Sequence, residues 1–439
     1  MPDRDVLHSD INCCYAQIEC QARPELRGKP VVVGGDEEAR HGIVLAKNLI
    51  AKRAGVKTAM ALWEARKACP GLVVVPPDYR LYMDVSRRAR EIYYDYTDRV
   101  EPFGPDEAWL DVTGTRRCLG LSPAEIAREV SERMVAELGI SVSVGVSWNK
   151  IFAKFGSDYK KPDAVTVITR ENYREVVWQA PVRDLLYVGP ATERKLHSSG
   201  IDTIGQLACA SDELLRNRLG KMGFVLRGFA RGQDATEVKP YDRYAADVMR
   251  EIKSYGNGLT APRDICDPQS AKAYVWMLAG IGAQRMREGR ARARTVSVGA
   301  RAADDLCTRS RQCKLPVATD VTLEVARAAW GLLRALEPLD ASHPLRGIHV
   351  RASDLEPADA DLQASLFAPL PRRTEMRELA ASAAALRRRY GNKCVVWGAQ
   401  LVDEGAASVD AKAHHTAHPA TLFHPPGPDH SHDTRASRK

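Results

Sequence analysis

The chain has 439 residues and a formal net charge of +8, and 44% of its residues are hydrophobic and 27% are charged. These proportions exclude a largely disordered chain, and the lack of any run of about 18 apolar residues disfavours a membrane protein. A single core stops growing near roughly 250–300 residues, so the length predicts several domains. The basic excess suits a polyanionic partner.

The N-terminus and the cysteines indicate the compartment. Residues 1–5 are too polar for a signal peptide, so the protein is expected to be cytoplasmic and to make no contact with a membrane. The ten cysteines include no Cys-x-x-Cys pair, which disfavours a zinc site and favours reduced thiols. We interpret the adjacent Cys13 and Cys14 as small buried hydrophobic residues.

The first part of the chain contains a buried strand and a small self-contained block. The strand spans residues 5–10 and ends at Asp10. The block covers residues 14–81. It is predicted to hold short strands at 31–33, 42–46 and 72–75, a helical stretch that stops at Gly55, and a helix over 57–69.

Residues 82–170 complete a recognisable topology. The predicted elements are a helix over 82–97, strands over 99–101 and 107–112, a helix over 122–138, a strand over 141–146, a helix over 149–159 and a strand over 164–168. The helix that follows Ser122 opens with a capping box, because Glu125 stands three residues after this cap. With the first strand, the order β-α-β-β-α-β is that of a ferredoxin-like split βαβ. Its first and third strands are central neighbours, which places Asp10 close to residues 106–107.

Residues 171–235 are predicted to be all helical. Within them Val188 to Thr192 fits a helix-hairpin-helix. Its turn, around Gly189 and Ala191, can direct backbone N–H groups at a DNA phosphate. An ordinary helical hairpin is the alternative. A polar linker over 236–246 follows.

Residues 247–355 predict a separate α+β unit. Its strands are expected at 295–301 and 347–351, and its helices near 269–287 and 319–336. After residue 356 the composition changes. A helix is predicted over 373–389, and the Ala-, His- and Pro-rich end is expected to be disordered, with a metal-binding histidine tract as the alternative.

Three carboxylates carry the strongest chemical indication. Asp10 ends the first strand, and Asp106 and Glu107 open the third. Mg²⁺ prefers oxygen ligands and is usually shared with substrate phosphates. Two such ions about 3.5–4 Å apart clamp the attacking and leaving oxygens of phosphoryl transfer. If the three side chains converge, the chain is a nucleotidyl transferase that uses two Mg²⁺ ions.

Four motifs give the chain a family resemblance. They are Asp10 to Ala16 followed by Glu19, Gly28 to Val31, Gly104 to Ala108, and Gly145 to Lys150. On these motifs the chain resembles the Y-family translesion DNA polymerases, close to the bacterial DNA polymerase IV group, over nearly its whole length.

The resemblance implies a multidomain α/β (α+β) right-hand polymerase. The expected parts are a ferredoxin-like βαββαβ palm from 1–13 and 82–170, small fingers from 14–81, a helical thumb from 171–235, a linker over 236–246, an α+β little finger from 247–355 and a C-terminal tail from 356–439. The implied activity is template-directed, low-fidelity DNA synthesis past lesions, from dNTPs onto a primer 3′-hydroxyl and without proofreading. A noncatalytic polymerase-like adaptor and a palm-fold nucleotide cyclase are the alternatives.

The resemblance also implies the catalytic residues. Asp10, Asp106 and Glu107 are the expected metal ligands, together with the backbone carbonyl of Ile11. Because such a reaction demands mainly positioning and charge stabilisation, the presence of all three carboxylates argues against the adaptor. Tyr15 matches the family's steric gate, whose ring would collide with a 2′-hydroxyl and so select deoxyribose. A core aromatic is the alternative.

The residues expected to bind the triphosphate depart partly from the family pattern. Lys161 matches the family's triphosphate-binding lysine, with a solvated run of charge as the alternative. The family usually has a Tyr and an Arg three residues apart in the fingers, where this chain has Leu49 and Lys52. Lys52 keeps the charge but loses the bidentate fork. Asn12 stands where many relatives carry a second Asp, at a position that is not a metal ligand.

Contacts with DNA and with a sliding clamp are expected in the second half of the chain. The candidate DNA-binding residues are Arg285, Arg287, Arg290, Arg292, Arg294 and Arg301, which flank the strand at 295–301. A solvated helix end and loop are the alternative. The segment from Gln363 to Phe367 resembles the clamp-binding pentapeptide, in which Leu366 and Phe367 fill an apolar pocket. A local hydrophobic cluster is its alternative, and the protein is expected to be monomeric.

Overall fold

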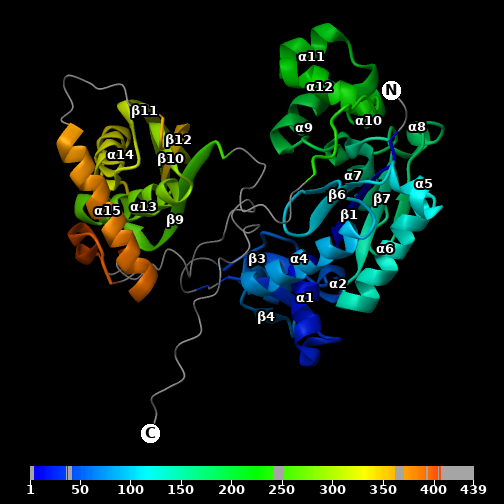
Figure 1. The fold of residues 1–439 in the computed structure, drawn as a ribbon, viewed down its shortest axis with the longest axis horizontal. Coiled ribbons are helices and arrows are strands. Elements are labelled where there is room, and N and C mark those ends of the chain that lie inside the picture. The colour runs from blue at the N-terminus through cyan, green and yellow to red at the C-terminus, as the bar shows by residue number, and fades with distance from the viewer. Residues whose placement is uncertain are drawn as a thin grey trace. The chain divides into compact units, whose positions relative to one another are not determined.

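The computed structural model describes residues 4–35, 37, 42–240, 252–360, 370–391, 394–403 and 405–406. The described chain divides into two units with separate cores. The first unit comprises 4–35 and 43–240, and the second comprises 252–406 with its gaps (Figure 1). No helix among the described residues is both long and apolar enough to span a membrane.

A five-stranded sheet forms the centre of the first unit. Its strands are β1 (Val6–Ile11), β5 (Val100–Pro102), β6 (Glu107–Asp111), β7 (Val142–Ser147) and β8 (Val165–Val167). Their order is β5-β6-β1-β7-β8. Strand β1 is antiparallel to both of its neighbours, whereas β8 is parallel to β7. The predicted pairing of the first and third strands is therefore confirmed.

Three helices cover the two faces of this sheet (Figure 1). They are α4 (Tyr79–Tyr94), α6 (Pro123–Leu138) and α7 (Lys150–Tyr159). The predicted capping box is present on α6, where Ser122 and Glu125 each accept the other's backbone N–H. Helix α4 begins three residues before the predicted start, because the Asp78 side chain accepts the N–H of Leu81 and caps it.

The alternation of β1 decides which side chains meet which helix. Leu7 and Ile11 pack into the core with α4 and α6, and Ser9 accepts a hydrogen bond from Tyr93 of α4. Val6 packs against α7 instead, through Ala153. Because successive side chains in a strand point to opposite faces, His8 and Asp10 also face α7.

A small block is inserted after β1. Its strands are β2 (Val31–Gly34), β3 (Val44–Lys47) and β4 (Val73–Val75), in the order β3-β2-β4. Its helices are α1 (Cys14–Ala22), α2 (Leu49–Arg53) and α3 (Leu62–Ala68), with a 3₁₀ turn over Pro24–Leu26. The predicted helix over 57–69 is too long, since the first turns are replaced by an isolated bridge from Ala61 to Ile43.

The end of the first unit is helical among its described residues, as predicted. After the short α5 (Thr115–Leu119) in the sheet region, the helices are α8 (Tyr173–Val176), α9 (Pro190–His197), α10 (Ile204–Cys209), α11 (Asp212–Leu219) and α12 (Lys221–Ala230), with a 3₁₀ turn over Val182–Asp184. They enclose their own core, which includes Leu196, Leu207 and Leu226.

The second unit is built on a four-stranded antiparallel sheet. Its strands are β9 (Ser254–Ile265), β10 (Ala291–Ala302), β11 (Thr308–Thr319) and β12 (Leu345–Pro357), in the order β11-β10-β12-β9. Helices α13 (Pro268–Glu288) and α14 (Thr322–Leu336) pack on one face. Helix α15 (Leu370–Tyr390) and a 3₁₀ turn over Gly398–Val402 follow.

Two strands of this sheet were not predicted. The sequence predicted only the parts of β10 and β12 over 295–301 and 347–351, and β10 in fact begins at Ala291. Most of β11 is solvent-exposed on both faces, so it lacks the alternation by which a half-buried strand is recognised.

Candidate active site

The register of β1 and β6 brings the carboxylates together. Asp10 lies directly opposite Glu107, and the N–H of Ile11 donates to the carbonyl of Asp106 at 3.0 Å. The three predicted acidic residues therefore meet at one end of the paired strands, although the chain between them forms the whole inserted block and α4.

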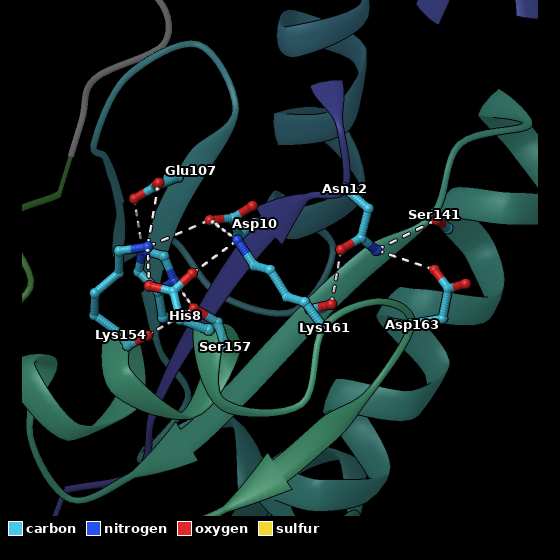
Figure 2. Close-up of polar contacts among 11 residues, drawn as sticks. His8, Asp10, Asn12, Glu107, Ser141, Lys154, Ser157, Lys161 and Asp163 are labelled. Atoms are coloured by element: carbon cyan, nitrogen blue, oxygen red, sulfur yellow. Dashed lines mark hydrogen bonds and ion pairs between the residues drawn. The ribbon is translucent and has the colours of Figure 1, made fainter. Parts of the chain in front are cut away.

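Helix α7 adds a cation to this cluster. Lys154 Nζ lies 3.3 Å from Asp10 Oδ2 and 3.2 Å from Glu107 Oε1, and 2.8 Å from Asp158 Oδ2 on the same helix (Figure 2). A second ammonium group comes from the segment after α7, where Lys161 Nζ lies 2.7 Å from Asp10 Oδ2 and 2.8 Å from Asp158 Oδ1. The carboxylates are thus held by two lysines.

His8 lies beside Glu107 inside the fold without donating a hydrogen bond to it. It is fully buried, its Nδ1 lies 2.9 Å from the hydroxyl of Ser157, and its Nε2 lies 3.3 Å from Glu107 Oε2 (Figure 2). Burial, together with the charge of Lys154, lowers the pKa of His8 well below its usual value, so the imidazole is neutral at pH 7.

Burial also shifts the pKa values of Asp106, Asp10 and Lys154. It raises the pKa of Asp106 to about 6, with help from the charges of Glu107 and Asp10. It raises the pKa of Asp10 as well, against the opposing effect of the two lysines. For Lys154, burial alone would lower the pKa, but Glu107, Asp10 and Asp158 outweigh it and the pKa is raised. Lys154 is therefore a permanent cation in this site.

The oxygen-rich donor set fits a hard divalent cation. Glu107 Oε2 is buried and has no aligned hydrogen-bond donor among the described residues, so this oxygen is free to bind an ion. In the conformation described, no three His, Cys, Asp or Glu side chains of the described residues are grouped closely enough to hold a metal. In this conformation the ammonium group of Lys154 lies within 3.3 Å of both Asp10 and Glu107.

A cavity of about 390 Å³ opens beside the carboxylates. Its lining brings together the residues predicted to hold metal, to select the sugar and to bind the triphosphate, namely Asp10, Ile11, Tyr15, Lys52, Asp106, Glu107 and Lys161. Leu49 also lines it, as do Lys47 and Thr58, which bond to each other at 2.8 Å. Lys47 adds a further lysine side chain to the lining that includes Leu49 and Lys52.

Tyr15 is held in place by a second aromatic residue. Its ring stacks on that of Tyr82, with centroids 4.3 Å apart and planes 10° from parallel, and Tyr79 contacts both rings edge-on. The hydroxyl of Tyr82 donates to the buried Glu19 at 2.5 Å. The stack on Tyr82 therefore holds the ring of Tyr15 in one position beside the cavity.

Sequence reasoning missed His8, Lys154 and Asp158. A signal for two of them existed, because Lys154, Asp158 and Lys161 are spaced by four and three residues, which is the spacing of one helix face. His8 left no such signal, since a histidine inside an apolar strand is usually a core residue.

The candidate DNA-binding residues lie in different environments. Gly189 is the N-cap of α9 and Ala191 lies in its first turn. In the second unit Arg290 and Arg301 are exposed, whereas Arg292 is buried and donates to the carbonyl of Ala360.

The other arginines of this set also make internal contacts. Arg285 donates to Asn257, Arg287 donates to the carbonyl of Asp320, and Arg294 pairs with Glu356. Arg292 and Arg294 belong to β10 itself and do not precede the strand as predicted. The clamp-like segment with Gln363, Leu366 and Phe367 lies outside the described residues.

Comparisons with known proteins give the class of the protein. The family model described as impB/mucB/samB family matches residues 9–158, and the model of that family's C-terminal domain matches residues 252–366. The fold resembles a Y-family DNA polymerase chimera of Dbh and Dpo4, with a TM-score of 0.69 and 24% identity, over 80% of this chain and 98% of that one.

Curated relatives agree with this class. DNA polymerase IV of Acetivibrio thermocellus is 44% identical over 92% of this chain and 98% of its own length. DNA polymerase IV 2 of Bacillus subtilis is 33% identical over 93% and 97%. The chain therefore belongs to the impB/mucB/samB family of Y-family DNA polymerases.

Proposed function

We propose that this chain copies damaged DNA by transferring nucleotides from dNTPs to a primer 3′-hydroxyl, with two Mg²⁺ ions. The observation that carries the proposal is the meeting of Asp10, Asp106 and Glu107 beside a cavity that also contains Tyr15 and Lys161. Two bound Mg²⁺ ions would neutralise the developing charge on the attacking and leaving oxygens. Low fidelity and the absence of proofreading belong to the same proposal.

Each group in the site has a proposed role. The carboxylates of Asp10, Asp106 and Glu107 and the carbonyl of Ile11 hold the ions. Lys161 and Lys52 bind the triphosphate as point charges, and Lys47 supplies a further charge. The hydroxyl and the guanidinium usual in the family are missing at Leu49 and Lys52.

Tyr15 selects the sugar in this proposal. Its ring lines the cavity and is fixed by the stack on Tyr82, so it has little freedom to make room for a 2′-hydroxyl. The two residues would therefore act together to exclude ribonucleotides.

The Asp106→Ala variant tests the catalytic assignment. Removal of one carboxylate is expected to abolish nucleotide addition in a primer-extension assay with Mg²⁺, while binding of primer-template DNA stays within about threefold. Asp84→Ala, at an exposed aspartate paired with Arg87 on α4, is the matched control and should extend the primer normally. Extension by Asp106→Ala would refute the assignment. A wild-type chain that binds DNA but never extends a primer would favour the adaptor.

The proposed grip on DNA involves both units. The first turn of α9, with Gly189 and Ala191, directs N–H groups at a phosphate. In the second unit we assign contacts with DNA phosphates to the exposed Arg290 and Arg301. Arg292 is left out of this assignment because its side chain is buried.

Binding of the sliding clamp through Gln363, Leu366 and Phe367 is the remaining part of the proposal, with the chain acting as a monomer. Phe367→Ala should reduce recovery of the protein by immobilised clamp at least about tenfold, since such anchors carry most of a short peptide's affinity. Primer extension without the clamp should not change. Undiminished recovery of the variant would rule out this anchor.

A further inference from the structure

Asn12 makes a contact that the proposed chemistry does not use. It is buried just after Asp10, and its side-chain Nδ2 donates to Asp163 Oδ1 at 3.0 Å and to the Ser141 hydroxyl at 3.3 Å (Figure 2). Its Oδ1 accepts from the hydroxyl of Ser143 at 2.8 Å. A carboxylate oxygen accepts hydrogen bonds, so these partners define which end of the amide is which.

The backbone of Asn12 is also fixed, so its side chain is a rigid support. Its N–H donates to the carbonyl of Ser141 at 3.0 Å, and its carbonyl accepts from Gln17 Nε2 at 2.6 Å. The same Gln17 accepts the N–H of Ser141 at 2.8 Å. Three neighbouring elements, β1, α1 and the start of β7, are joined at this point.

Asp163 belongs to the short segment that carries Lys161. This segment leaves α7 at Tyr159 and is tied to β7 where the N–H of Val144 donates to the carbonyl of Ala164. Asp163 has φ = 59°, in the left-handed region, which Asp and Asn tolerate better than most other side chains. Two residues earlier, Lys161 reaches Asp10 across the cavity.

We propose that the Asn12–Asp163 hydrogen bond is a positioning contact that holds Lys161 at the triphosphate side of the cavity. It rests on the proposed role of Lys161 in binding dNTPs. The contact needs an amide donor on at least one side, because two carboxylates facing each other would repel. Asn12 is thus matched to Asp163.

Four proteins in a mutant cycle test the match. Asn12→Asp sets two carboxylates against each other, and like charges so close repel and displace the segment. We expect KM for dNTP to rise on the order of tenfold while kcat changes less than about threefold, the size of coupling usual for residues in contact. Asp163→Asn keeps a donor and an acceptor, and its KM should stay within about twofold of wild type.

The exchanged pair Asn12→Asp with Asp163→Asn carries the decisive result. The carboxylate introduced at position 12 can accept from the amide introduced at position 163 and from Ser141 and Ser143, so KM should return to within about twofold of wild type. Asn172→Asp is the matched control. This asparagine accepts the N–H of Thr169 and donates to the carbonyl of Val167, remote from the cavity, and its substitution should leave KM unchanged. No recovery in the exchanged pair overturns the proposal.

A second readout separates this inference from the proposed function. Amide hydrogen exchange in residues 159–166 should speed up in Asn12→Asp and recover in the exchanged pair, whatever Lys161 binds. If exchange recovers but Lys161→Ala leaves KM for dNTP unchanged, the role of Lys161 fails and the positioning contact stands. If exchange is the same in all four proteins, the contact positions nothing and the inference fails.

Discussion

At the scale of single residues, the sugar selection that we propose for Tyr15 would depend on a pair of stacked rings. Tyr15 alone could rotate away from a ribose, but the parallel stack on Tyr82 removes that freedom. Tyr82 in turn donates a hydrogen bond to the buried Glu19, which lies 3.3 Å from Arg23. The proposed steric gate is therefore supported by three successive contacts, from Arg23 to Glu19, from Glu19 to Tyr82 and from Tyr82 to Tyr15.

Tyr82→Leu is predicted to relax sugar selection while Tyr15 remains. An aromatic stack of this kind contributes about 0.5–1.5 kcal/mol, so ribonucleotide incorporation should rise roughly two- to tenfold. Tyr15→Ala should raise it further. Single-nucleotide insertion of a dNTP and the matching rNTP measures the ratio. Tyr82→Phe keeps the stacked ring but loses the hydrogen bond to Glu19, so its ratio separates the two contributions. Equal ratios for Tyr82→Leu and wild type would contradict the prediction.

The carboxylate cluster predicts an unusual dependence of stability on pH. The pKa of Asp106 is raised to about 6 by burial and by Glu107 and Asp10, so the folded protein holds a proton that the unfolded chain releases near pH 4. This contribution to stability is present below about pH 4 and is lost as the pH rises through about 6. His8 acts in the opposite direction, because its pKa is lowered.

Comparison with Asp106→Asn isolates that contribution. The experiment is done with a chelator present, so that no metal is bound. The free energy of unfolding of wild type minus that of Asp106→Asn should fall by on the order of 2 kcal/mol as the pH rises from about 4 to 7. Urea unfolding at several pH values measures it. A difference that does not change with pH would mean that Asp106 titrates normally. Below about pH 6 the same protonation should also weaken Mg²⁺ binding.

At the scale of elements, α7 is the helix that assembles the site. It can supply Lys154 and Ser157 because it lies close against β7, where a Cβ added at Gly145 would overlap the carbonyl of Ala153 and the backbone of Ser157. The close approach of helix and strand therefore requires a glycine at position 145.

Gly145→Ala is predicted to destabilise the first unit and to lower activity together with it. Overpacking against backbone typically costs about 1–3 kcal/mol of stability. Activity should fall as well, because the displaced helix carries Lys154, which contacts Asp10 and Glu107. Urea unfolding and primer extension measure the two effects. Gly114→Ala, where an added Cβ meets no atom within 4 Å, is the control and should change stability by less than about 0.5 kcal/mol.

Elements also show how far the sequence could predict the structure. The pairing of β1 with β6 followed from topology, and α6 followed from its capping box, because both depend on local or well-tested patterns. His8 could not be placed, and the helical spacing of Lys154 with Asp158 did not reveal its carboxylate partners, since both roles arise from the packing of α7 over β1. Strand β11 was missed because its exposed side chains do not alternate.

At the scale of the whole molecule, the second unit presents a sheet face without covering helices among the described residues. The register places Arg301, Arg351 and Lys314 on that face, opposite the apolar side that meets α13 and α14. Arg311 belongs to the other face and donates to the carbonyl of Ala335 on α14. Sequence reasoning counted arginines but could not sort them by face.

Arg351→Ala is predicted to weaken binding of primer-template DNA uniformly across sequences. If the side chain meets one phosphate, the slope of log K against log salt should fall by about 1. Fluorescence anisotropy from about 50 to 200 mM salt measures that slope, and Arg311→Ala is the control on the opposite face. An unchanged slope for Arg351→Ala would show that DNA does not lie on this face.

The central place of β1 in its sheet also affects when the strand can pair during synthesis of the chain. The strand is synthesised first, but its partners β6 and β7 and the covering α7 emerge from the ribosome much later. At about 5–20 residues per second, β1 waits on the order of ten seconds with both edges unpaired. The carboxylate cluster can therefore assemble only after α7 has been synthesised and packs over β1.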